Sequence, residues 1–289
     1  MFKTLRQSWC SVLHQLSTLA DIAHYVNLIK NGQSIATGDN EVLTRIYTGQ
    51  LIYVDRRDLS VAPHLMMSGL WEFEITEIFR RYVKADTVLF DVGANLGYFG
   101  LVAGTYNHQG QLHFFDANPA FAPLIRKSLS VNGLPSRATV TTAAITAQGG
   151  EPVTLNLCRD HWGSASLHPI AESEFVQTAE AVTVPSLTLD DYCADRGINR
   201  VDLIKLDIEG YEEQAVQGMP RLLEDNPQLV IFMEYTYGAY SEDFVAFLQA
   251  RFRISAIVGW DLVEVRNQTH LEQLGEGWIM LVLEPPLGR

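Results

Sequence analysis

The chain has 289 residues, 47% of them hydrophobic, and a formal net charge of −13. This length suits one large α/β domain with additions or two small domains, and the apolar content is ample for a core. The strong negative charge argues against nucleic acid or an anionic membrane surface as the main partner.

Composition also bears on the compartment. No apolar run reaches the roughly 18 residues that a bilayer-spanning helix needs. The N-terminal segment is interrupted by His14, Asp21 and His24, so it is neither a convincing signal peptide nor an anchor. We therefore expect a cytoplasmic protein with a reducing environment and no structural zinc, because no C-x-x-C pair occurs among Cys10, Cys158 and Cys193.

The first 80 residues are predicted to form an N-terminal extension with three elements. These are an amphipathic helix over residues 5–30, a hairpin over residues 44–55 and a helix over residues 70–83. The first helix ends at Asn31-Gly32, and its apolar face suits core packing or a homodimer. Residues 81–289 are expected to form the main domain.

Residues 88–100 are the most informative segment. An apolar run ends in Asp91, and a turn containing Gly93 and Gly97 follows before a helix-compatible segment. Glycine allows a ligand to approach the backbone closely and adopts φ angles that other residues resist. The N–H groups of the loop and the positive end of the helix would then favour an electron-rich ligand, so we expect a nucleotide-like cofactor.

Two familiar nucleotide fingerprints are absent from this loop. Asn95 occupies the place of the second glycine of G-x-G-x-x-G, and no G-K-[ST] follows. Asp91 would repel a pyrophosphate but could pair with an ammonium group. An adenosine ligand that carries an amino acid, such as S-adenosylmethionine, fits this charge pattern.

The next predicted strand ends at Asp116, about 20 residues after the glycines. This is the spacing at which a carboxylate meets ribose hydroxyls in nucleotide-binding α/β folds. The alternative is that Asp116 only caps the helix that begins at Asn118 and Pro119. We favour the ribose role because of the loop upstream.

Strands and helices alternate along the rest of the chain, which predicts a largely parallel, doubly wound sheet. Further strands are expected at 139–145, 201–207, 229–234, 254–258 and 278–283. An irregular section lies between the third and fourth strands, with short β segments at 152–157 and 181–184.

These motifs together resemble the FkbM-type S-adenosylmethionine-dependent methyltransferases. The resemblance rests on D-V-G-A-N-L-G at 91–97, F-D-A-N-P at 115–119, L-T-L-D-D at 187–191 and the stretch from Val201 through K-L-D-I-E-G to Glu212. It covers approximately residues 69–284. The family usually carries Glu where this chain has Asp116, and the shorter acid still reaches a ribose.

The resemblance implies a class I, Rossmann-like fold with seven mostly parallel strands, of which the last is antiparallel. It implies methyl transfer from S-adenosylmethionine to a hydroxyl oxygen of a small molecule, such as a sugar or an acceptor in natural product biosynthesis. Asp91 would meet the cofactor's ammonium and Asp116 its ribose. Ala143, Ala144 and Ile145, at the end of the third strand, either border its adenine or are plain core residues of the strand. The implied cofactor-binding residues are Glu72, Asp91, Gly93, Ala94, Asn95, Gly97, Asp116, Asn118 and Ala144.

Asp207 and His161 are the candidate catalytic residues. Asp207 ends the fourth strand at the edge where open α/β sheets bind ligands, and a carboxylate there could accept the proton of an alcohol. His161 is the competing base. Glu209 is assigned to the N-terminus of the next helix. A divalent metal held by Asp207 and Glu234 is an alternative that we do not favour.

Other functions remain open on the sequence alone. One is N-methylation on the same fold, and another is an NAD-dependent oxidoreductase, against which Asn95 and Asp91 argue. A third is a cofactor-binding module that dimerises without catalysis. Trp71 and Glu72 either close over the cofactor or begin a packed helix. We expect a small-molecule acceptor, and neither nucleic acid nor a membrane, as partner.

Overall fold

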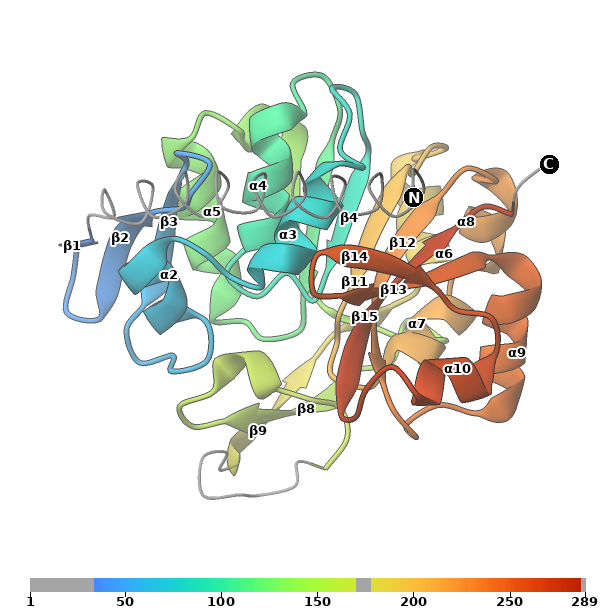
Figure 1. Ribbon diagram of the computed structural model, residues 1–289. Helices are drawn as coiled ribbons and strands as arrows, with labels where there is room; N and C mark the ends of the chain where they lie inside the picture. The colour runs from blue at the N-terminus through green and yellow to red at the C-terminus, as the bar shows by residue number, and fades with distance from the viewer. Residues whose placement is uncertain (1–33, 170–177, 287–289) are drawn as a thin grey trace, which may run out of the picture.

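The computed structural model describes residues 34–169 and 178–286 (Figure 1). The helix expected over residues 5–30 lies outside the described residues. Among the described helices, none combines the length and the apolar character needed to cross a bilayer.

An eight-stranded sheet forms the centre of the molecule, with the order β14-β13-β15-β12-β11-β4-β5-β6. The strands are β4 (Leu89–Val92), β5 (Leu112–Asp116), β6 (Ala138–Thr142), β11 (Leu203–Leu206), β12 (Val230–Thr236), β13 (Arg253–Val258), β14 (Asp261–Glu264) and β15 (Trp278–Glu284). The five strands from β6 to β12 are parallel, and β15 is antiparallel to both neighbours. The expected Rossmann-like α/β fold is confirmed. β14 adds an eighth strand at the edge, which the sequence pattern did not predict.

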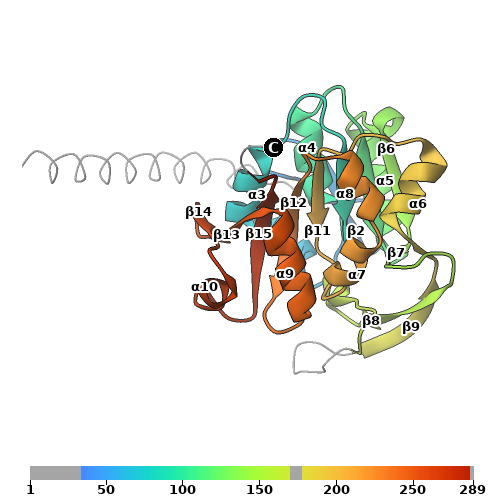
Figure 2. The same cartoon turned by 90° about the vertical axis from the view of Figure 1, so that its right-hand side faces the viewer.

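Helices cover both faces of this sheet (Figures 1 and 2). They are α3 (Phe73–Arg80), α4 (Tyr98–Tyr106), α5 (Phe121–Val131), α6 (Leu189–Arg196), α7 (Glu212–Gln217), α8 (Pro220–Asp225), α9 (Glu242–Arg251) and α10 (Gln268–Glu272). Two hydrophobic clusters result, one with α3–α5 and one with α6–α9. Neighbouring residues of β4 show why: Leu89 belongs to the first cluster and Phe90 to the second, as alternation along a strand requires.

The described part of the N-terminal extension packs into the first cluster. It comprises β1 (Ile35–Ala36), β2 (Glu41–Arg45), β3 (Leu51–Asp55) and α2 (Ala62–Ser68). The predicted hairpin is confirmed as β2–β3. Its second strand is fastened to α5, because the Tyr53 N–H donates to Ser128 Oγ at 2.9 Å and Asn132 bonds the backbone of Leu51.

The helix expected over 70–83 is shorter, and α2 before it was not predicted. Gly69 separates the two helices with a φ of 70°. A Cβ at this position would lie 2.4 Å from the carbonyl oxygen of Arg45, so the chain has to turn here under the hairpin. α3 therefore begins only at Phe73.

The strand expected over 139–145 is also divided. β6 ends at Thr142, and β7 (Ala144–Ile145) pairs instead with β10 (Ser186–Leu187). The backbone explains the break, because the Ala143 N–H still donates to Asp116 whereas the Ala144 N–H donates to Pro185.

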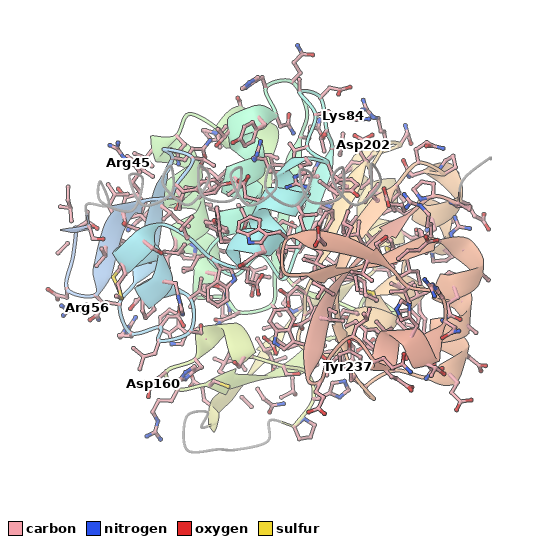
Figure 3. All side chains as sticks on the ribbon, in the orientation of Figure 1. Arg45, Arg56, Lys84, Asp160, Asp202 and Tyr237 are labelled. Carbon is pink, nitrogen blue, oxygen red and sulfur yellow. The ribbon has the colours of Figure 1, made fainter. Side chains whose placement is uncertain are left out.

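The irregular section forms an antiparallel ribbon of β8 (Val153–Cys158) and β9 (Thr178–Val184), which confirms both short β segments. Two 3-10 turns, η1 (Pro135–Arg137) and η2 (Trp162–Ser164), complete the described elements. Figure 1 shows the ribbon beyond one end of the central sheet. Labelled side chains mark the two ends in Figure 3: Lys84 and Asp202 precede strands, whereas Asp160 and Tyr237 lie at the end where strands terminate.

Candidate functional site

A cavity of about 450 Å³ lies at the carboxyl ends of the parallel strands. Residues from four strand ends line it: Asn95 after β4, Asp116 on β5, Asp207 after β11 and Glu234 on β12. This is the edge at which open α/β sheets bind ligands. Three tryptophans, Trp71, Trp162 and Trp278, line the same cavity.

The glycine loop has the predicted backbone but a different reason for its glycines. Gly93 and Gly97 have φ angles of 80° and 82°. A Cβ on Gly93 would lie 1.6 Å from the carbonyl oxygen of Asp207, and one on Gly97 would lie 3.3 Å from the side chain of Ile125. The packing of the neighbouring strand end and helix therefore already requires glycine at both positions, and the close approach of a ligand to this loop stays a prediction.

The N–H groups of this loop are largely bonded within the protein. Those of Gly93 and Ala94 donate to Phe115, that of Asn95 to Asp116 Oδ2 and that of Gly97 to Ala94. The expectation that these N–H groups face an electron-rich ligand is therefore wrong for these four. Gly93, Ala94 and Asn95 still line the cavity, so the loop contributes its shape.

Asp116, at the end of β5, is hydrogen-bonded to the loop that follows β4. Its Oδ2 accepts the Asn95 N–H at 2.7 Å and its Oδ1 accepts the Asn118 N–H at 2.8 Å. Desolvation by burial raises the pKa of Asp116 to about 7, although these two hydrogen bonds lower it. Each carboxylate oxygen can accept a second bond, so Asp116 can still accept hydroxyl donors from the cavity.

The apolar wall beside Asp116 contains the residues expected at an adenine. Ala143, Ala144 and Ile145 line the cavity, and so does Asn118. The break between β6 and β7 lies at this point, because the backbone changes its hydrogen-bond partner from Asp116 to Pro185. A flat apolar ring would fit such a surface.

Asp91 and Lys205 lie together beneath the glycine loop. They are register partners on β4 and β11, and they are 1% and 3% exposed. Asp91 Oδ2 accepts the Gly100 N–H, while its Oδ1 has no partner among the described residues. Asp91 and Gly97 are not part of the cavity lining, so their cofactor contacts stay predictions.

Lys205 lines the cavity and has no role in the sequence analysis. Its ammonium donates to Asp207 Oδ2 at 2.5 Å and lies 4.6 Å from the centre of the Phe99 ring. Burial lowers the pKa of Lys205, but the charges of Asp207, Glu72 and Asp91 outweigh this and raise it. Lys205 is therefore a buried cation that partly compensates several carboxylates.

Backbone strain is concentrated at this cavity. Within residues 34–169 and 178–286, the non-glycine residues with positive φ are Glu72 at 42°, Asn95 at 52° and Glu209 at 56°. All three line the cavity. Such conformations cost on the order of 1–3 kcal/mol each and concentrate at functional sites. Glu72 Oε2 and Asn95 Oδ1 are also buried without a partner in the described structure.

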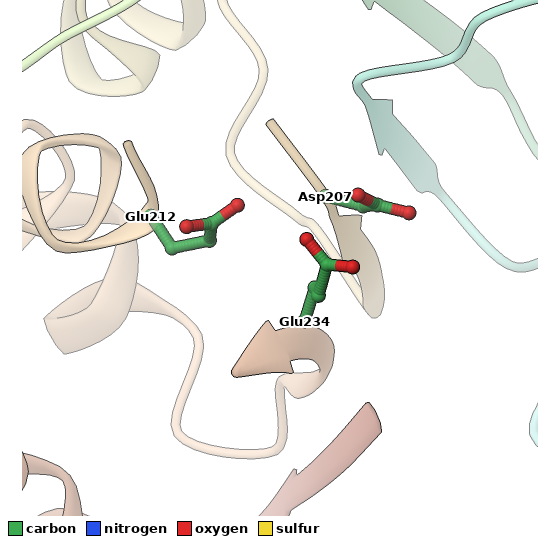
Figure 4. A group of neighbouring side chains, drawn as sticks. All are labelled: Asp207, Glu212 and Glu234. Carbon is green, nitrogen blue, oxygen red and sulfur yellow. The ribbon is translucent and has the colours of Figure 1, made fainter. Parts of the chain in front are cut away.

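Three carboxylates form a cluster at the ends of β11 and β12 (Figure 4). Asp207, Glu212 and Glu234 each offer an oxygen within 4.8 Å of the others. Two of them already have partners, because Asp207 bonds Lys205 and Glu212 accepts the Ile208 N–H and the Tyr240 hydroxyl. Glu212 is also fully buried. A metal would have to displace these bonds, so we continue to disfavour it.

The crowding of carboxylates perturbs their protonation. Burial and the charges of Asp207, Glu209 and Glu212 raise the pKa of Glu234 to about 10. The pKa of Glu209 is also raised, first by desolvation and then by Asp207 and Glu212, although the residue is exposed at the cavity mouth. The assignment of Glu209 to a helix N-terminus is wrong, because α7 begins at Glu212 and Glu209 lies in the loop before it.

Asp58 and Ser60, from the N-terminal extension, form hydrogen bonds to the loop that contains Trp162 and Gly163. Asp58 is fully buried and accepts the N–H groups of Ser60, Val61, Ala62 and Trp162. Ser60 Oγ in turn accepts the Gly163 N–H. The ring of Trp162 thereby becomes part of the cavity wall.

His161 precedes this loop but is not among the lining residues. Its Nδ1 is buried without a hydrogen-bond partner in the described structure. The structure thus brings Asp207 to the cavity and leaves His161 beside it, and the catalytic role of either residue stays a prediction.

Comparison with known proteins gives a family match and distant relatives. A family model described as "Methyltransferase FkbM domain" matches residues 91–259. The 2-O-methyltransferase NoeI of Sinorhizobium fredii (strain NBRC 101917 / NGR234) is 26% identical over 144 residues, which are 47% of this chain and 58% of that protein. The aligned region thus spans less than two thirds of this relative.

Two solved structures illustrate the structural similarity. An S-adenosylmethionine-dependent O-methyltransferase of Thermotoga maritima has a TM-score of 0.44 at 12% identity, covering 89% of this chain and 87% of its own. The tRNA (uracil-54, C5)-methyltransferase of Pyrococcus abyssi, solved with S-adenosyl-L-homocysteine, has a TM-score of 0.46 at 11% identity, covering 86% and 44%.

Proposed function

The chain belongs to the FkbM methyltransferase family, and from this premise we propose that it transfers a methyl group from S-adenosylmethionine to a hydroxyl oxygen of a small molecule. The observation that carries the proposal is the division of the cavity. The glycine loop, Asp116 and Ala144 line one part of it, and Asp207 lines it with Glu209 and Glu234. A cofactor side and a proton-accepting side thus share one space.

The residues of the first part fit the cofactor by their chemistry. Asp116 keeps acceptor capacity for ribose hydroxyls, and the unpartnered Oδ1 of Asn95 offers another buried acceptor. Ala143 to Ile145 supply an apolar wall for adenine. S-adenosylmethionine would contribute an electrophilic methyl group on a sulfonium, and the protein contributes position and desolvation.

Asp207 is the residue that we assign to proton transfer. When a hydroxyl oxygen gains a bond to the methyl carbon, the carbon–sulfur bond breaks and the hydroxyl proton has to leave. The Asp207 carboxylate lines the cavity and can accept that proton. Lys205 holds its Oδ2, and no described residue bonds its Oδ1, so one oxygen remains for the acceptor.

The walls suit an acceptor with apolar faces and hydroxyl groups. Trp71, Trp162 and Trp278 give the cavity flat surfaces, and Trp278 is 49% exposed at its mouth. The name of the relative NoeI, a 2-O-methyltransferase, favours oxygen over nitrogen as the methyl acceptor. The NAD-dependent alternative gains no support from the family match.

Two measurements test this function in sequence. The first is a calorimetric titration with S-adenosylhomocysteine and NADH, for the wild type and for Asp116→Ala. We expect micromolar binding of S-adenosylhomocysteine that the variant loses, and no binding of NADH. The second is incubation with methyl-labelled S-adenosylmethionine and paired acceptors, glycosides or phenols against the corresponding amines. Labelling of amines alone would contradict O-methylation, and binding of NADH alone would contradict methyl transfer.

A further inference from the structure

The side chain of Glu72 does not cap the helix at whose N-terminus it lies. Glu72 is the residue before the first turn of α3, yet it makes no capping hydrogen bond. Its backbone has φ 42° and ψ 60°, in the left-handed region that glycine favours. Its Oε2 is buried without a partner among the described residues, and the residue lines the cofactor cavity.

The cation whose charge acts on Glu72, Lys205, is already engaged. Lys205 lowers the pKa of Glu72, but its ammonium donates to Asp207 at 2.5 Å. Within the described chain, no ion pair joins Glu72 to a lysine or arginine. Desolvation is the main cause that raises the pKa of Glu72 to about 7, and the charge of Asp207 adds to it. Glu72 is therefore a half-buried residue whose buried Oε2 has no full counter-charge.

The whole cavity has the same imbalance. Its ionisable lining residues are one base, Lys205, and five acids: Glu72, Asp116, Asp207, Glu209 and Glu234. The raised pKa of Glu234, about 10, keeps that residue protonated at neutral pH, and those of Glu72 and Asp116 are about 7, so a cation in the cavity would favour their ionised forms. Opposite charge in a partly buried site is attracted strongly, because solvent screens it weakly. A ligand with additional positive charge should therefore bind better than an isosteric neutral one.

The methyl donor and its by-product differ in this respect. S-adenosylmethionine carries a sulfonium, an ammonium and a carboxylate, whereas S-adenosylhomocysteine has a neutral thioether in place of the sulfonium. We propose that Glu72 is the residue that distinguishes the two, because the additional positive charge of the donor neutralises its uncompensated carboxylate. The inference rests on the proposed function. It means that methyl transfer itself weakens the retention of the by-product.

Titration calorimetry with three ligands tests this role without any methyl acceptor. The ligands are S-adenosylmethionine, S-adenosylhomocysteine and sinefungin, which carries an amine in place of the methylated sulfur. In Glu72→Gln we expect about tenfold weaker binding of S-adenosylmethionine and sinefungin, the two ligands with the additional positive charge, equivalent to about 1.4 kcal/mol. Binding of S-adenosylhomocysteine should change less than twofold.

Two further variants control the experiment. Glu74→Gln removes the same charge from the same helix at a residue outside the cavity lining, and all three affinities should stay within twofold. Glu72→Gly removes the carboxylate and relieves the positive φ. It should melt no lower than the wild type and should show the same selective loss, which separates binding from folding.

Each outcome bears on the inference. Equal weakening of all three ligands in Glu72→Gln would mean that Glu72 contacts a group common to them, and unchanged affinities would mean that it contacts none. Either result overturns the role in discrimination while leaving methyl transfer intact. If the wild type binds none of the ligands, the proposed function fails and the inference fails with it.

Discussion

Gly93→Ala should be the most disruptive single-methyl change in the cofactor loop. A Cβ built at Gly93 lies 1.6 Å from the carbonyl oxygen of Asp207, and real Cβ atoms do not approach closer than 3.0 Å. β4 and the end of β11 would have to separate by at least the difference between these two distances. This movement would disturb the bond from the Asp207 N–H to the Val92 carbonyl, which is 3.0 Å long.

The magnitude follows from two contributions. Positive φ in a non-glycine residue costs roughly 1–2 kcal/mol, and a buried backbone hydrogen bond that is lost costs about 1–3 kcal/mol. The sum is about 2–5 kcal/mol. At roughly 2 °C per kcal/mol for a chain of this size, the melting temperature should fall by about 4–10 °C.

Gly197→Ala is the matched control, because Gly197 has a φ of 63° and a Cβ added there would have nothing within 4 Å. This variant has the backbone strain alone, so its melting temperature should fall by only about 2–4 °C. Differential scanning calorimetry measures both. Equal decreases would show that the contact between β4 and β11 yields easily, and the reasoning from close approach would be refuted.

Three other changes have defined outcomes. Asp207→Asn should lower kcat by about 10²–10⁴-fold while S-adenosylhomocysteine affinity stays within threefold, and an unchanged kcat would remove Asp207 as the base. Burial raises the pKa of Asp116 to about 7, so its protonated form stabilises the fold at low pH and that contribution is lost as pH rises towards 7. The melting temperature of Asp116→Asn should accordingly depend less on pH between about 4 and 8 than that of the wild type, and parallel curves would contradict this. Asp58→Ala leaves four backbone donors unpaired, of which those of Val61 and Ala62 are buried and those of Ser60 and Trp162 half-buried. Urea unfolding should therefore show a loss of about 3–5 kcal/mol, and a loss below about 1 kcal/mol would show that water replaces the carboxylate.

Local patterns predicted the parts of the fold that depend on neighbouring residues in the chain. Apolar runs located the parallel strands, and the glycine spacing located the loop with its positive φ angles. The break after Thr142 was missed because Ala144 and Ile145 continue a stretch of β-branched and apolar residues without a turn signal. Only their pairing with Ser186 and Leu187, about 40 residues further on, ends the strand.

Lys205 shows what the sequence contained but local reasoning did not use. A lysine inside the apolar run Leu-Ile-Lys-Leu has to be paired if the strand is buried. Its partners, however, depend on which strands are neighbours. Asp91 lies opposite Lys205 only because β11 pairs with β4, and these residues are 114 positions apart.

The wall of the cavity argues that the N-terminal extension is part of the site. Glu72 and Trp71 precede the first parallel strand, and Asp58 binds the Trp162 backbone across 104 positions of sequence. By themselves, residues 81–289 would place the glycine loop, Asp116 and Asp207 at an open edge of the sheet. Without the residues before them, that edge would lack Trp71, the Asp58 bond to the Trp162 backbone and the carboxylate assigned to charge discrimination. Part of the cavity wall, Trp71, Glu72 and Trp278, therefore consists of residues that the family match at 91–259 does not cover.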